Sequence, residues 1–186
     1  MGGPASNTLV ERNNLDDTFG PAIESDGLRT VIRRNTITST LFVGSTLFGV
    51  QIEAAARDNR VEANNIDRPS FIGVDDSGTR TVTTANLIVG QVYPDLPTGG
   101  IALIIVREKA SDGRIQANVV RRHAPGIGVD TGAGIQIFGD RFTVAANVAN
   151  DNTDLGIEAV PGVTDGGGNR ASGNGNPAQW VGVRCS

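Results

Sequence analysis

The fold is decided by residues 49–66, which read GVQIEAAARDNRVEANNI, because the same pattern returns along the whole chain. A short run with β-branched Val50 and Ile52 is followed by a polar turn, a second β-branched position at Val61 and the residue Asn64. Seven asparagines share this setting, in which a β-branched residue (a glycine in the last case) stands three positions before and an apolar residue two positions after. They are Asn13, Asn35, Asn64, Asn86, Asn118, Asn147 and Asn169.

The spacing of these asparagines is irregular, whereas the pattern upstream of them is constant. Consecutive members lie 22, 29, 22, 32, 29 and 22 residues apart. Twelve positions before each of the last six, the residue is apolar and β-branched: Ile23, Ile52, Val74, Val106, Ile135 and Ile157. Self-similarity of this kind is typical of repeat proteins.

We interpret each repeat as one coil of a β-solenoid. Short β-branched strands separated by turns rich in Gly, Asp and Ser fit this architecture, and no stretch has the sustained apolar spacing of a helix. The sequence therefore predicts an all-β parallel β-helix of about seven coils with little or no helix. Coils about 4.8 Å apart would stack the asparagines into a ladder, which gives them a structural role. Residues 1–174 are the predicted β-helix domain, and 175–186 are a C-terminal capping tail.

Charge and composition exclude several classes of function. The net charge of −4 argues against a nucleic-acid partner. The longest apolar stretch, Ile101–Val106, is too short to span a membrane. The single cysteine, Cys185, cannot form an internal disulfide, and the single histidine, His123, excludes a zinc site built from several histidines.

The chain resembles the right-handed parallel β-helix repeat proteins of the pectate-lyase-like superfamily. The resemblance rests on residues 49–52 with 59–66, on GIQI at 134–137, and on residues 156–158 with 164–179. It implies an extracellular or cell-surface location and an anionic polysaccharide as partner. Proteins with this ending often have a cysteine where this chain has Trp180, so we expect Trp180 to pack over the last coil instead.

Insertions between repeats are expected to cluster at one corner of the solenoid. They fall at residues 39–48, 90–100 and 121–133, each after the strand that follows an asparagine. Insertions at one corner commonly build a binding face, although passive loops are equally well tolerated by solenoids. Tyr93, in the second insertion, either stacks on a sugar ring or pins its own loop.

A polar row follows the conserved apolar positions and is expected to face outward. It reads Glu24, Glu53, Asp75, Arg107, Gln136 and Glu158. Carboxylates on adjacent coils repel each other by about 1 kcal/mol, so a cation or Arg107 would stabilise them. The plain alternative is a solvated outer face. By resemblance to polysaccharide lyases, Glu53, Asp75 and Asp76 would hold calcium, Gln136 would contact substrate, and Arg107 or Lys109 would act as the base or clamp the carboxylate.

A basic run precedes the third insertion. Arg121 and Arg122 match the carboxylate or sulfate of an anionic sugar, and His123 is a candidate general base or proton donor at neutral pH. A surface charge cluster explains the run equally well.

Two functions remain open from the sequence. One is a polysaccharide-binding β-helix that also cleaves its ligand by a lyase-like reaction. The other is a non-catalytic structural or adhesive module that self-associates through its ends, because the chain opens directly with a repeat half and shows no N-terminal cap helix.

Overall fold

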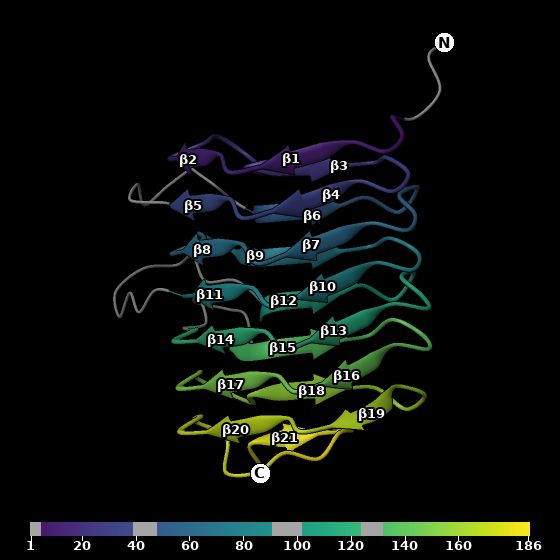
Figure 1. Ribbon diagram of the computed structural model, residues 1–186. Helices are drawn as coiled ribbons and strands as arrows, with labels where there is room; N and C mark the ends of the chain where they lie inside the picture. The colour runs from purple at the N-terminus through teal and green to yellow at the C-terminus, as the bar shows by residue number, and fades with distance from the viewer. Residues whose placement is uncertain (1–4, 39–47, 91–101, 124–131) are drawn as a thin grey trace.

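The computed structural model describes residues 5–38, 48–90, 102–123 and 132–186, which form three parallel sheets of seven strands each. These residues contain no helix, as the sequence predicts. Each coil contributes one strand to each sheet, so strands that are neighbours in a sheet are three apart in chain order (Figure 1).

Sheet 1 holds the strands that precede each ladder asparagine: β1 (Leu9–Glu11), β4 (Val31–Arg33), β7 (Arg60–Glu62), β10 (Val82–Thr84), β13 (Arg114–Gln116), β16 (Thr143–Ala145) and β19 (Thr164–Gly167). Sheet 2 holds those that follow it: β2 (Asn14–Asp16), β5 (Thr36–Thr38), β8 (Asn65–Asp67), β11 (Leu87–Val89), β14 (Val119–Arg121), β17 (Val148–Asn150) and β20 (Arg170–Ser172). Sheet 3 closes each coil: β3 (Ile23–Ser25), β6 (Phe48–Ile52), β9 (Ile72–Asp76), β12 (Ala102–Val106), β15 (Ala133–Ile137), β18 (Ile157–Ala159) and β21 (Trp180–Val181).

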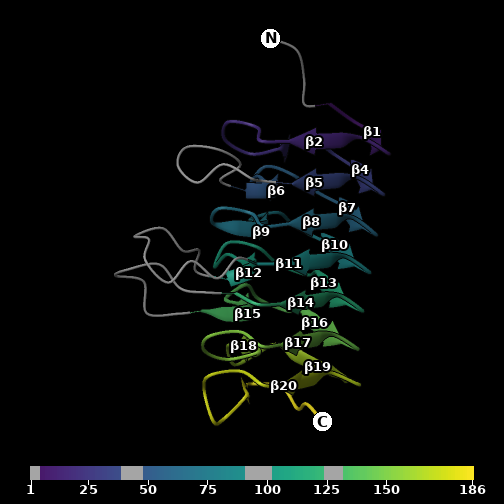
Figure 2. The ribbon, with the colours of Figure 1, turned by 90° about the vertical axis from the view of Figure 1, so that its left-hand side faces the viewer.

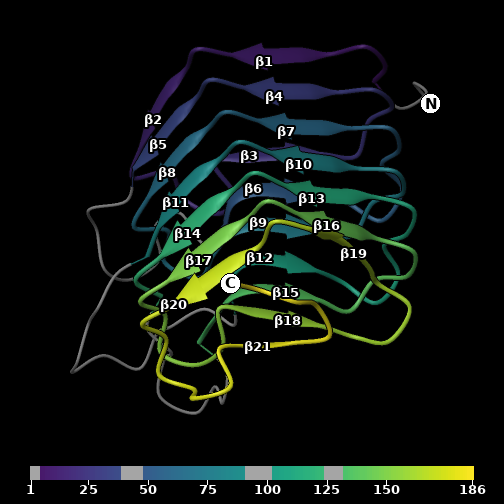
Figure 3. The ribbon, with the colours of Figure 1, turned by 60° about the horizontal axis from the view of Figure 1, so that its bottom comes forward.

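The coils wind as a right-handed parallel β-helix. In Figure 3 the C-terminal end faces the viewer, and the chain runs counterclockwise from β1 through β2 to β3 as it advances toward that end. Figure 2 shows the strands of sheet 2 stacked in chain order along the axis. The predicted fold class is therefore confirmed.

The predicted asparagine ladder runs unbroken through all seven coils. The side-chain Nδ2 of each member donates to Oδ1 of the next, at 2.9 to 3.1 Å. The same Oδ1 accepts the backbone N–H of the preceding asparagine. From the second member on, Nδ2 also donates to a sheet 1 carbonyl of the coil before. The ladder thus satisfies the polar groups of a buried corner.

The backbone turns sharply beside each ladder residue. The residue before the asparagine is left-handed in all seven coils. In six of them it is arginine or alanine, with φ between 54° and 57°, and in the seventh it is Gly168, with φ 71°. Such a conformation costs energy for a residue with a Cβ. The hydrogen bonds of the ladder asparagines hold the chain in this left-handed conformation. The interior between the sheets is filled by stacked Ile, Val and Leu side chains that form one continuous core.

One detail of the repeat differs from the prediction, which places every extra residue at one corner. Along sheet 3, Asp76 pairs with Ile52 and Val106. The next aligned positions are Thr79, Arg57 and Ser111. Asp76 and Thr79 are three residues apart, whereas the equivalent residues of the other two coils, Ile52 and Arg57 in one and Val106 and Ser111 in the other, are five residues apart. Two extra residues therefore lie in the turns after β6 and β12, at 54–55 and 108–109.

The C-terminal end of the solenoid is covered by the chain's own tail. Strand β21 pairs with β18, and Trp180 packs against the core, as the sequence predicts. Val183 is buried, and the backbone N–H of Arg184 donates to Oδ2 of Asp165 at 3.0 Å. Cys185 is a free thiol. The tail therefore covers the core at this end, while β19, β20 and β21 remain the last strands of their sheets.

Candidate functional site

The outward-facing row on sheet 3 differs from the predicted row at two positions. In order along the coils it reads Glu24, Gln51, Asp75, Ile105, Gln136 and Glu158. Glu53 and Arg107 lie two residues further along, at the turn after the sheet. A shift of two residues keeps side chains on the same face of a strand. The alternation of polar and apolar residues in the sequence therefore could not reveal this two-residue shift.

Arg107 nevertheless reaches back to Asp75 and forms a two-pronged ion pair. Its Nε and Nη2 donate to the two carboxylate oxygens of Asp75 at 2.7 and 2.8 Å. The Asp75 side chain is 8% exposed and that of Arg107 36%. The hydrogen bond to Asp75 raises the pKa of Arg107 above its ordinary value. Arg107 is therefore a fixed cation that keeps three further N–H donors, two of them on Nη1, for a ligand.

Two protruding turns enclose a surface pocket at this end of sheet 3. The turns after β6 and β12 are each closed by one backbone hydrogen bond, from Ala56 to Glu53 and from Ala110 to Arg107, both 2.9 Å. The shorter turn after β9 lies between them. The pocket, which we call the turn pocket, is lined by Ala54, Ser77, Arg107, Glu108, Lys109 and Phe138.

The turn pocket brings together two of the predicted catalytic residues, Arg107 and Lys109. Lys109 is exposed and takes part in none of the ion pairs that the described residues form. Its ammonium group offers three donors. Phe138 contributes an aromatic ring to the same pocket and packs against an apolar cluster of Ile72, Ala102 and Ile105 on the outer side of sheet 3.

Asp76, a predicted metal ligand, faces the interior instead. Its position in the register lies between the core residues Ile52 and Val106, and it is fully buried. One carboxylate oxygen accepts the backbone N–H of Gly78 at 2.9 Å, and Oδ2 has no hydrogen-bond partner. Burial raises the pKa of Asp76 to about 7, although the Gly78 bond opposes that rise.

The remaining predicted residues do not join the turn pocket. Gln136 is buried and donates to Glu158 at 2.7 Å. Arg121 and Arg122 are exposed at the end of β14, at the corner that leads from sheet 2 to sheet 3. The turn pocket lies at the far end of the sheet 3 strands. A five-residue strand, roughly 17 Å long, therefore separates the two. His123 is 4% exposed, and its backbone N–H donates to Asn152. Tyr93 lies outside the described residues.

Sequence reasoning missed Ala54, Ser77 and Phe138 as members of a site. The spacing of the asparagines gives no separate signal for the longer turns. The intervals of 29 and 32 residues that end at Asn64 and Asn118 contain them, but the interval of 29 that ends at Asn147 does not, since Ile137 and Asp140 are three residues apart.

The described residues contain no group of three or more His, Cys, Asp or Glu side chains placed to hold a metal ion. They also include no helix long and apolar enough to cross a membrane. Comparison with protein-family models, with curated proteins and with solved structures finds no match. The assignment of the protein to the class of parallel β-helices therefore rests on the geometry of its coils alone.

Proposed function

We propose that this β-helix binds an anionic saccharide, such as a uronate-containing polysaccharide, in the turn pocket. The observation that carries the proposal is that Arg107, Lys109 and Phe138 line one pocket between two protruding turns. Fixed cations recognise carboxylates, and aromatic rings give sugars an apolar contact surface.

Each side chain has a distinct task in this proposal. Arg107 is held by Asp75, so its position is set before the ligand arrives and little side-chain entropy is lost on binding. Lys109 places a mobile ammonium group against the sugar carboxylate. Ser77 offers a hydroxyl at the floor, and Phe138 receives the less polar face of the ring. The pocket extends over four coils, from β6 to β15, or about 14 Å along the axis.

The arrangement supports binding better than cleavage. A lyase needs a base that is deprotonated before it reacts, and the ion pair with Asp75 raises the pKa of Arg107, so its guanidinium releases a proton even less readily than that of a free arginine. His123 is far along the coil from the pocket and is buried. Arg107 therefore fits the role of carboxylate clamp. A place in the pectate-lyase-like superfamily and an extracellular location are parts of the same proposal.

The residues predicted for calcium do not fit a common ion. Asp75 and Asp76 are adjacent in β9, so their side chains point to opposite faces of the sheet. Both oxygens of Asp75 are engaged by Arg107, and one oxygen of Glu53 accepts from Gln51 at 2.8 Å. We therefore assign no step to calcium.

Calorimetric titration with oligogalacturonate tests the proposal. We expect saturable binding that weakens as salt rises, and a roughly tenfold loss of affinity in Lys109→Gln, because one charge-assisted hydrogen bond contributes about 1.5 kcal/mol. Arg114→Gln is the matched control, since Arg114 is an exposed cation on sheet 1. Equal affinity of parent and Lys109→Gln, or equal losses in both variants, would refute the pocket. Unsaturated product ends, followed in the same samples, report any cleavage.

A structural role is the second candidate, in which the solenoid assembles through its ends. It is favoured by the strands of the first coil, which form the outer edge of all three sheets. Light scattering over a range of concentrations tests self-association. A rise in mass supports it, and a constant monomer mass contradicts it.

A further inference from the structure

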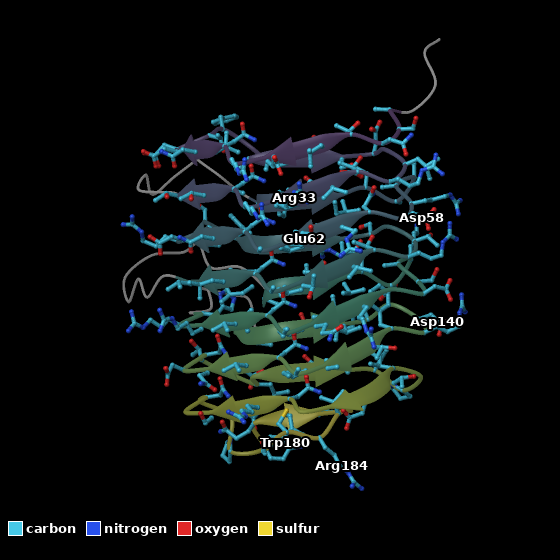
Figure 4. The ribbon with its side chains drawn as sticks, viewed as in Figure 1. Arg33, Asp58, Glu62, Asp140, Trp180 and Arg184 are labelled. Carbon is cyan, nitrogen blue, oxygen red and sulfur yellow. The ribbon has the colours of Figure 1, made fainter. Side chains whose placement is uncertain are left out.

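The first coil is the open edge of the solenoid. Strands β1, β2 and β3 each end their sheet, and within the described residues no strand pairs with their outer side. Apolar Val10, Leu15 and Ala22 at this end are only partly buried against the core. The opposite end is covered by the tail that contains Trp180 and Arg184 (Figure 4). An open parallel edge is a template for adding a further strand.

The asparagine ladder is incomplete at this edge. Inside the ladder, Oδ1 of each asparagine accepts two hydrogen bonds from the coil before it, and Nδ2 donates to a carbonyl of that coil. Asn13 donates to Asn35 but, within the described residues, has no coil before it to supply these partners. Its carbonyl oxygen and one N–H therefore face outward as a ready acceptor and donor.

Two rows of polar side chains alternate between acceptor and cation from this edge inward, over three coils on sheet 1 and over six coils at the turn before it, and both begin with an acceptor. On sheet 1, Arg33 lies between Glu11 and Glu62, with Nε 2.6 Å from Glu11 Oε2 and Nη1 3.8 Å from Glu62 Oε1 (Figure 4). At the turn before sheet 1 the left-handed residues alternate in the same way: Asn7, Arg29, Asp58, Arg80, Asp112 and Arg141.

The arginines of the turn row each donate to the acceptor of the coil before. Arg29 donates to Asn7 at 2.9 Å, Arg80 to Asp58 at 2.5 and 2.8 Å, and Arg141 to Asp112 at 2.5 and 3.0 Å. Arg33 has a carboxylate on each side, so a cation beyond Glu11 would continue the sheet 1 row. Asn7 already accepts from Arg29, so the turn row requires no partner beyond it.

The net negative charge of the chain is also confined to this end. Residues 1–26 contain five of the twenty acidic residues and one of the sixteen basic ones: Glu11, Asp16, Asp17, Glu24 and Asp26 against Arg12. The other 160 residues carry fifteen of each sign, so their net charge is zero. A second copy meeting this edge with its own first coil would bring like charges together.

We propose that the first coil is a docking edge for an arginine-bearing β-strand of another polypeptide, which adds in parallel to β1 and β2. This inference uses the same open edge as the second candidate function, but its partner is a different polypeptide rather than a second copy of this chain. Backbone hydrogen bonds to the open edge supply affinity. An arginine opposite Glu11 and an amide opposite Asn13 supply register.

A peptide with the sequence of residues 27–38, GLRTVIRRNTIT, is a suitable probe. This segment already pairs with β1 and β2 from the other side, and it carries Arg33 and Asn35 at the positions that face Glu11 and Asn13. The carbonyl of Thr8 and the N–H of Arg12 point to the second coil, so the N–H of Leu9 points outward by alternation. Leu9→Pro removes that free donor without breaking the chain's own ladder.

Titration of the whole chain with this peptide, followed by amide exchange, tests the proposal. We expect binding that weakens with salt, slower exchange in β1 and β2, and at least a tenfold weaker complex for Leu9→Pro or for a peptide with Arg33→Glu. Leu9→Ala keeps the N–H and should bind as the parent does. The proposal is overturned if the parent does not bind the peptide, if Leu9→Pro and the parent bind it equally, or if the edge pairs only with a second copy of this chain.

Discussion

Asn86 and Asn118 lie 32 residues apart in the chain and share two hydrogen bonds, because the backbone N–H and the side-chain Nδ2 of Asn86 both donate to Oδ1 of Asn118 at 3.0 Å. This contact repeats through every coil of the ladder. It fixes which residues face inward and hence where the turn pocket and the open edge lie.

Replacing a central ladder residue is expected to destabilise the fold far more than replacing the terminal one. Asn118→Ala leaves buried donors of Asn86 and a buried carbonyl of Thr83 without partners, so we expect a loss of roughly 3 kcal/mol or more in the free energy of unfolding. Asn13→Ala, at the exposed end, should lose about 1 kcal/mol. Denaturant titration measures both, and equal losses would contradict a cooperative ladder.

The buried carboxyl of Asp76 predicts a specific pH dependence. Its pKa is about 7 in the folded chain, against the ordinary value of 3.8 for an aspartate exposed to water. Between these values the unfolded chain releases the proton and the folded chain retains it. The contribution to stability is therefore fully present below pH 3.8 and falls as pH rises toward 7, by up to roughly 4 kcal/mol.

Asp76→Asn isolates this effect because it keeps the shape and removes the titration. Unfolding free energies of parent and variant, measured from pH 4 to pH 8, should diverge by that amount, with the variant gaining as pH rises. Asp76→Val, which fits between Ile52 and Val106, should be more stable than the parent at pH 8. Parallel pH curves for parent and Asp76→Asn would contradict the buried acid.

A close contact in the core predicts an intolerant glycine. A Cβ at Gly113 would lie 2.3 Å from Cε1 of Phe142 and 2.6 Å from the backbone oxygen of Thr81. Phe142 is fully buried, so Gly113→Ala should cost about 3 kcal/mol. The double variant with Phe142→Leu should recover part of that loss, because the ring is one of the two obstacles. Thermal melting distinguishes these results, and a Gly113→Ala chain as stable as the parent would contradict the packing.

The sequence predicted the coil geometry well because the ladder depends on one residue type at one position. Asn64 and its equivalents carry the corner, and apolar residues at a fixed distance before them carry the core. The same regularity prevented the turn pocket from being predicted. Ile52 and Val106 lie two residues past the aligned position of Val74, and they still face inward because side chains alternate with a period of two.

Composition and spacing were also unable to show that Asp76 faces the core. An aspartate next to Asp75 suggests a shared cation, but adjacent residues in a strand point to opposite faces. Pairing across coils had to be known before Arg107 was assigned to Asp75. The turn pocket, built from four coils, has no local motif in the sequence.

Shortening one turn tests the central claim most directly, namely that the paired two-residue insertions create the saccharide site. Deleting Ala54 and Ala55 gives the turn after β6 the length of the turn at Ser77, removes one wall of the pocket and changes no charge. We predict a folded chain with the parent's melting temperature within a few degrees and at least a tenfold loss of affinity for oligogalacturonate in calorimetric titration. Undiminished affinity in that folded variant would contradict the claim.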